Sequence, residues 1–100
     1  MAEKPNENLP ISNAKVYFKA LSVGQLSDIE LIKTEINLGN IIVAKITPLA
    51  KKSIEDTTKA VDELCTFVEK VGGDIARLGE ERLVITPPSI KIWKEKENHE

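Results

Sequence analysis

Residues 40–47, with the sequence NIIVAKIT, form a nearly continuous apolar run. Gly39 precedes the run and Pro48 follows it, and a short apolar run bounded in this way is typical of a central strand in a sheet. We expect this strand to be buried on both faces, or mostly so. Such a strand needs further strands beside it and helices to cover it, which favours a layered α/β fold.

A strand and a helix are predicted before this central strand. Residues 15–21 (KVYFKAL) alternate weakly and are rich in aromatic and β-branched residues, which predicts a first strand. Apolar residues then recur with helical spacing from Leu26 to Ile36. Gly39 is placed to end this helix.

A longer helix is predicted over residues 53–71, after the central strand. Ser53 is the expected N-cap, since Ser53 and Asp56 resemble a capping box with Asp in place of Glu or Gln. Gly72 and Gly73 end the helix, and one of them is expected to supply a left-handed cap.

The C-terminal part predicts a β-hairpin. Residues 74–78 and 82–86 are strand-like and flank a short loop that contains glycine. Two prolines then break the pattern. Residues 89–94 alternate again and predict a last edge strand, which Lys91 and Lys94 would protect from pairing.

These elements define one small domain in the order β-α-β-α-β-β, with or without a fifth strand at its end. The expected fold is an α+β two-layer sandwich, with a mixed sheet of four to five strands and two helices on one face. Residues 1–14 predict a flexible N-terminal arm, residues 15–93 the folded domain, and residues 94–100 a polar tail. Trp93 could pack under the sheet or against a partner.

The helix over residues 53–71 is more apolar than a single sheet requires. Its apolar residues span roughly 180° of the circumference, whereas a stripe modestly wider than about 100° suffices for packing on one sheet. The surplus edge comprises Ala60, Leu64, Phe67 and Val71. Core packing against the neighbouring helix and an interaction surface are both consistent with it. Cys65 lies on the apolar arc and is expected to be a buried structural thiol.

Composition argues against several functional classes. The chain contains one Cys and one His, which cannot form an internal disulfide or build a zinc site. His99 lies in the polar tail, so a catalytic relay through an oriented histidine is not expected. The net charge of −2 disfavours nucleic-acid binding. We therefore expect no catalytic site, no cofactor and no metal.

Arg77 and Leu83 are candidate binding residues. They lie on the two strands of the predicted hairpin, beside the end of the second helix. An Arg beside an apolar groove suits a peptide that combines an apolar anchor with an acidic group or carboxylate. A surface Arg and a core Leu are the simpler interpretation of the same two residues.

The order of these segments carries a family resemblance. The long helix ends in VGGDI at residues 71–75, Arg77 follows, and the next strand ends in RLVITP at residues 82–87. With the preceding strand GNIIV at residues 39–43, this pattern resembles SepF, and specifically its archaeal SepF-like branch. The resemblance covers about residues 15–93. Its most specific part is the Gly-Gly-x-Ile strand followed by the strand that ends in Thr-Pro.

The resemblance implies a non-enzymatic, cytoplasmic cell-division protein that forms a homodimer and could extend into a higher polymer. It implies binding of the C-terminal tail of FtsZ, or of an equivalent division protein. The family pocket involves a basic residue after Gly-Gly-x-Ile and a bulky apolar residue in the following strand. The expected peptide contacts here are Arg77, Leu83, Leu64, Phe67 and Val71. The expected oligomer interface comprises Ala60, Phe67, Gly72 and Gly73.

Other hypotheses stay open at this stage. Residues 1–14 do not resemble the amphipathic helix with which SepF usually binds the membrane, so we expect membrane contact only through a partner. The helix layer, the open sheet face, or both could form the dimer. The main alternative function is a general scaffolding or nucleic-acid-associated dimer that is not tied to FtsZ. A small-molecule enzyme or regulator with ligands between subunits is a further alternative.

Overall fold

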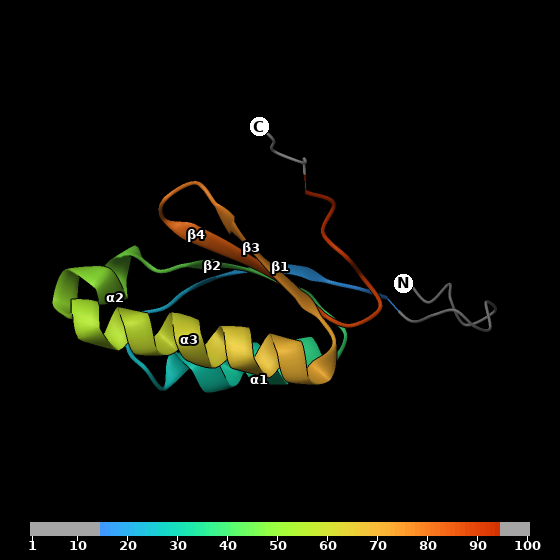
Figure 1. The fold of residues 1–100 in the computed structure, drawn as a ribbon, viewed down its shortest axis with the longest axis horizontal. Coiled ribbons are helices and arrows are strands. Elements are labelled where there is room, and N and C mark those ends of the chain that lie inside the picture. The colour runs from blue at the N-terminus through green and yellow to red at the C-terminus, as the bar shows by residue number, and fades with distance from the viewer. Residues whose placement is uncertain (1–14, 95–100) are drawn as a thin grey trace, which may run out of the picture.

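A computed structural model describes residues 15–94, which fold into one sheet with helices packed on it (Figure 1). The expected order β-α-β-α-β-β is confirmed, with one additional short helix. The arm expected at residues 1–14 and residues 95–100 of the expected tail lie outside the described residues. The elements, in chain order, are β1 (Phe18–Ser22), α1 (Asp28–Asn37), β2 (Ile41–Lys45), α2 (Thr47–Lys52), α3 (Ile54–Val71), β3 (Asp74–Leu78) and β4 (Arg82–Thr86).

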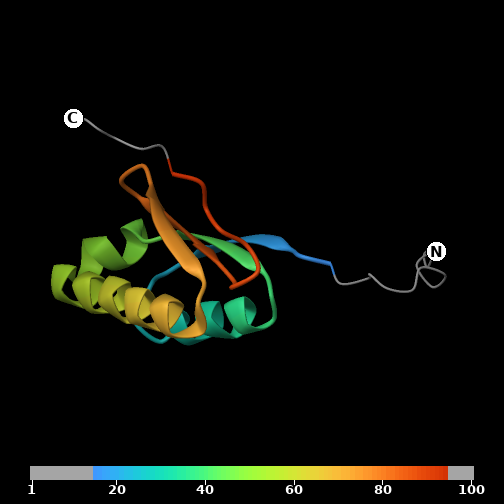
Figure 2. The ribbon, with the colours of Figure 1, turned by 45° about the vertical axis from the view of Figure 1, so that its right-hand side comes forward.

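The strands form one mixed sheet of four strands in the order β1-β2-β4-β3. β1 and β2 run parallel, whereas β4 is antiparallel to both of its neighbours, β2 and β3. Helices α1 and α3 lie on one face of the sheet, and no described helix covers the other face (Figures 1 and 2). The expected α+β two-layer sandwich is therefore confirmed.

β2 is a central strand, as its apolar sequence predicts, but only one of its faces is fully buried. Ile42 and Ala44 are fully buried. Ile41 and Val43 alternate with them and are half-buried on the opposite face. The expectation of burial on both faces is wrong in this respect, because the helices of residues 15–94 cover a single face.

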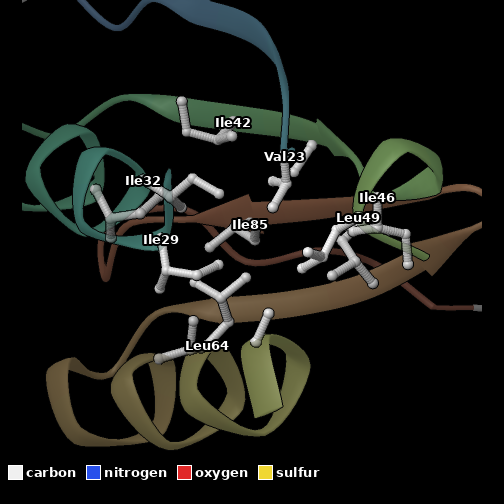
Figure 3. Packing of buried hydrophobic residues seen from close by; sticks show 13 residues of the cluster. Val23, Ile29, Ile32, Ile42, Ile46, Leu49, Leu64 and Ile85 are labelled. Atoms are coloured by element: carbon white, nitrogen blue, oxygen red, sulfur yellow. The ribbon is translucent and has the colours of Figure 1, made fainter. Parts of the chain in front are cut away.

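The hydrophobic core fills the space between the helices and the sheet. Figure 3 shows Ile29 of α1 and Leu64 of α3 pointing toward Ile85 of β4. Each of these side chains is fully buried. Burial of an Ile or Leu side chain contributes about 1.5–3 kcal/mol, so the contacts between α1, α3 and the sheet dominate the stability of the domain.

α3 begins and ends where the sequence predicts. The Ser53 hydroxyl accepts the Asp56 N–H at 3.0 Å, which confirms Ser53 as the N-cap. Gly72 forms the C-cap with a φ of 83°, in the left-handed region that favours glycine. Gly73 is needed for a different reason. A Cβ at this position would collide with the carbonyl oxygen of Thr86.

The short helix α2 is absent from the elements that the sequence predicts. Pro48 does end the preceding strand, and it also occupies the first turn of α2. Proline is favoured there because the first helical N–H groups have no partner within the helix. Six residues are too few to show a helical period of apolar side chains, and only Leu49 of α2 is buried.

The predicted edge strand at residues 89–94 is wrong. These residues form no strand and instead lie beside β3, held by side chains of both segments. The Asp74 carboxylate accepts the backbone N–H of Ile92 at 2.9 Å and contacts Lys94 Nζ at 3.1 Å. Lys94 Nζ also donates to the carbonyl of Ile75 at 3.4 Å. A clasp of side chains thus replaces the backbone ladder. Trp93 is 85% exposed.

Candidate partner-binding surface

Arg77 and Leu83 face each other across the hairpin. They are direct partners in the β3–β4 register, so both project from the helix-covered face of the sheet. Leu83 is only 4% exposed and belongs to the core. Arg77 is exposed because β3 is an edge strand, and its guanidinium donates to the carbonyl of Glu80 at 3.4 Å. The guanidinium therefore remains open to a partner.

The expected peptide contacts on α3 differ in their burial. Leu64 is fully buried in the core, so Leu64 and Leu83 can support a binding surface from beneath but offer little surface to a peptide. Phe67 and Val71 are partly buried and pack against the core, with some surface left exposed. Among the described residues, no hydrogen bond or cation–π contact joins Arg77 to Phe67.

Phe67 lies on the flank of α3 that faces α1. Lys33 of α1 places its ammonium 5.7 Å from the centre of the Phe67 ring and pairs with Glu63 of α3 at 2.7 Å. The hydrogen bond to Glu63 raises the pKa of Lys33 above its ordinary value. An open hollow of about 350 Å³ lies here, lined by Lys33, Asp62, Glu63, Thr66, Phe67 and Lys70.

The opposite flank of α3 carries an apolar surface that the sequence analysis missed. Ile54 is 76% exposed, Cys65 is exposed and Val61 is half-buried. At about 100° per residue, Cys65 lies about 200° around the helix from Phe67, on the side away from α1. We call Ile54, Val61 and Cys65 the outer flank of α3.

Arg77 lies on the strand that packs on α3. α3 is the helix that contacts β3, and Arg77 projects from the helix-covered face of that edge strand. In Figure 2, the orange strand β3 runs above α3, while α1 (teal) and β1 (blue) lie to the right of β3. The exposed Arg77 and the exposed outer flank of α3 thus belong to two elements that pack on each other. The expectation that Cys65 is buried is wrong, because the buried arc of α3 is centred on Leu64 and leaves Cys65 outside it.

The residues expected at an oligomer interface are divided between core and surface. Ala60 is fully buried beneath α3, and Phe67 lines the hollow beside α1. Gly72 is exposed at the helix end, whereas Gly73 lies against Thr86. These positions do not form one continuous exposed patch, because Ala60 offers no surface to a second chain.

A broader apolar surface lies on the face of the sheet away from the helices. The strand register places apolar side chains in adjacent rows across the strands, with Ala20, Val43, Val84 and Ala76 in one row. Phe18 and Leu78 extend this surface at the two edges and are largely exposed. We call these residues, with Ile41, the open sheet face.

The described residues offer little for metal or membrane chemistry. Between residues 15 and 94, no group of three or more His, Cys, Asp or Glu side chains is arranged to hold a metal ion. In the same range, no helix has the length and apolar character needed to cross a bilayer. The chemistry available at the outer flank and the open sheet face is apolar contact with adjoining charge.

The fold and these surfaces define a small two-layer α+β domain with exposed apolar surface on both layers. The family profile described as Cell division protein SepF matches residues 19–92. The chain belongs to the SepF family, and the resemblance inferred from the sequence is confirmed.

Individual relatives agree with this assignment. A cell division protein SepF of Haloferax volcanii is 33% identical over 78 residues, which cover 76% of this chain and 64% of that protein. A SepF-like protein from Archaeoglobus fulgidus has a similar structure, with a TM-score of 0.74 and 34% identity, covering 83% of this chain and 99% of the solved one. SepF from Methanobrevibacter smithii, solved in complex with FtsZ-CTD, shares the fold with a TM-score of 0.71 and 13% identity, covering 79% and 99%.

Proposed function

We propose that this chain is a cytoplasmic, non-enzymatic adaptor of cell division. It forms a homodimer and binds the C-terminal tail of FtsZ or of an equivalent division protein. Membership of the SepF family supports this function, and so does the M. smithii relative solved with FtsZ-CTD. The observation that carries the proposal is the exposed Arg77 on the edge strand that packs on α3, the helix whose outer flank is also exposed.

The proposed peptide site is built around Arg77. A guanidinium binds a carboxylate through paired hydrogen bonds, which suits an acidic residue or the terminal carboxylate of a tail. Apolar residues of the peptide pack on the outer flank, and Leu83 and Leu64 support this surface from within the core. Phe67 and Val71 provide a second apolar contact for a peptide that extends over α3 toward α1.

A homodimer strengthens binding to a polymeric partner. Each dimer offers two peptide sites, and the second site binds at the high local concentration set by the first. The open sheet face is the best dimer surface, since contiguous exposed apolar surface marks interaction sites. The helix-layer positions Phe67, Gly72 and Gly73 remain available for a second contact between dimers.

A titration with matched variants tests the peptide site. Fluorescence anisotropy of a labelled FtsZ C-terminal tail peptide is measured against the wild-type chain, Arg77→Glu and Arg82→Glu. Arg82 is a matched control because it lies on the same hairpin but projects from the opposite face. We expect Arg77→Glu to weaken binding by about tenfold or more, as for loss of a charge-assisted hydrogen bond. An equal loss of peptide affinity in both variants, or no loss of affinity in either variant, would exclude this site.

A further inference from the structure

The outer edge of β1 is an unpaired strand edge. In the register with β2, the Tyr17 carbonyl accepts the Ile41 N–H at 2.8 Å and the Val23 N–H donates to the Lys45 carbonyl at 2.9 Å. Backbone groups alternate in direction along a strand, so the even-numbered residues are out of phase with these bonds. The N–H and C=O groups of Phe18, Ala20 and Ser22 therefore point away from β2, and no strand in residues 15–94 pairs with them.

The other edge of the sheet is contacted by a following segment at the start of β3. Residues 89–94 run beside β3, where Lys94 donates to the Ile75 carbonyl and Asp74 holds the Ile92 N–H. A lysine and an adjoining irregular segment are devices by which proteins block pairing at a sheet edge. Within the described part of the chain, such contacts occur at Asp74 and Ile75 of β3 and not at β1, although Arg77 and Leu78 of β3 stay exposed.

β1 also lacks a charge that would discourage pairing. Its one lysine, Lys19, projects from the helix-covered face and is held by Glu35 at 3.0 Å. The residues at the start of the strand are apolar and exposed, with Tyr17 at 56% and Phe18 at 69%. An exposed, apolar edge without a protecting charge is a site at which another strand is expected to add.

We propose that this edge pairs with β1 of a second copy of the chain, antiparallel and about a two-fold axis at Ala20. This register places Ala20 opposite Ala20 and Phe18 opposite Ser22, so all three residues with free backbone groups are paired at once. The large Phe18 side chain then lies against the small Ser22 and Ala20 of the partner. Closed two-fold contacts of this kind are the commonest in homo-oligomers.

The edge contact uses the backbone of β1, whereas the open sheet face, to which Phe18 and Ala20 also belong, is made of side chains; the edge contact is separate from the peptide site. It joins two four-stranded sheets into one continuous sheet through backbone hydrogen bonds, whereas the open sheet face contributes side chains only. A chain that uses both contacts builds an extended ribbon. The edge contact does not depend on FtsZ binding, so either proposal can fail without the other.

A backbone variant tests the edge directly. Ala20→Pro removes an N–H that β2 does not use, and proline is tolerated in an edge strand. Sedimentation velocity is measured over a concentration series in a Val84→Glu chain, whose open sheet face is disrupted, with and without Ala20→Pro. Circular dichroism verifies folding. We expect Ala20→Pro to lose one concentration-dependent association step. A folded Ala20→Pro/Val84→Glu variant that associates like Val84→Glu alone overturns the proposal.

Cysteine pairs test the register. In a Cys65→Ser background, Ala20→Cys is expected to form a disulfide-linked dimer on mild oxidation, because paired strands bring opposite Cα atoms to about 5.5 Å. Phe18→Cys is the matched control, since position 18 faces position 22 of the partner and lies far from its own copy. The Ala20→Cys dimer should persist when Val84→Glu disrupts the open sheet face. Disulfide-linked dimers that form equally through position 18 and position 20, or through neither position, contradict this register.

The FtsZ tail is the alternative occupant of this edge. In that case Ala20→Pro would leave self-association unchanged and would weaken binding of the tail peptide, which also overturns the proposal.

Discussion

Gly72 and Gly73 show how two neighbouring glycines can serve different physical needs. Gly72 has a positive φ, whereas Gly73 approaches the Thr86 carbonyl too closely for any side chain. We predict that Gly72→Ala lowers the free energy of unfolding by about 1–2 kcal/mol, the cost of a left-handed non-glycine residue. Gly73→Ala should cost about 3 kcal/mol, because backbone must move. Urea unfolding measures both, and a smaller loss for Gly73→Ala would contradict the close approach.

Cys65 marks the limit of sequence reasoning at this scale. The sequence predicts the wide apolar arc of α3, but it does not predict which edge of that arc is exposed to water. The position of β3 and of α1 decides that, and it buries Leu64 while exposing Cys65 and Ile54. Arg77 and Leu83 could be identified from the sequence, yet their division into surface and core depends on β3 being an edge strand.

The clasp between β3 and residues 89–94 is expected to open in acid. The hydrogen bond from the Ile92 N–H, aided by Lys94, holds the pKa of Asp74 below its ordinary value. A lowered folded-state pKa means that the stabilisation is complete above about pH 4 and is lost as the pH falls through the folded-state pKa. We predict that Asp74→Asn weakens the clasp at neutral pH. Hydrogen exchange at the Ile92 amide should become faster in this variant, while exchange at Ile42 in the core stays slow. An unchanged Ile92 rate would show that the clasp does not hold the segment.

Elements defined by strong local signals were predicted well. The hairpin strands have the predicted bounds, and α3 has the predicted N-cap and glycine end. α2 was missed because six residues are too few to show a helical period, and the strand predicted at residues 89–94 is wrong because tertiary contacts hold that segment. Alternation in residues 89–94 is the pattern of a strand, but the Asp74 side chain occupies the Ile92 N–H that a backbone ladder would use.

At the scale of the whole molecule, the open sheet face should determine dimerisation. Val84 lies in its central row, between Val43 and Ala76. We predict that Val84→Glu abolishes the face-to-face dimer, because a carboxylate would be buried without a partner. Light scattering with size-exclusion chromatography measures the mass, and Arg82→Gln serves as a control at the rim of the same face. A Val84→Glu chain with the same mass as the wild-type chain would contradict this prediction and place the interface elsewhere, in the helix layer or at β1.

The central claim is that the FtsZ tail binds at Arg77 and the outer flank of α3. The most direct test is a titration of the ¹⁵N-labelled chain with an unlabelled FtsZ C-terminal tail peptide, followed by amide chemical shifts. The account predicts that the largest shifts fall on Arg77, its hairpin neighbours and the α3 residues around Val61 and Cys65. Shifts confined to the open sheet face, or no shifts at saturating peptide, would contradict it.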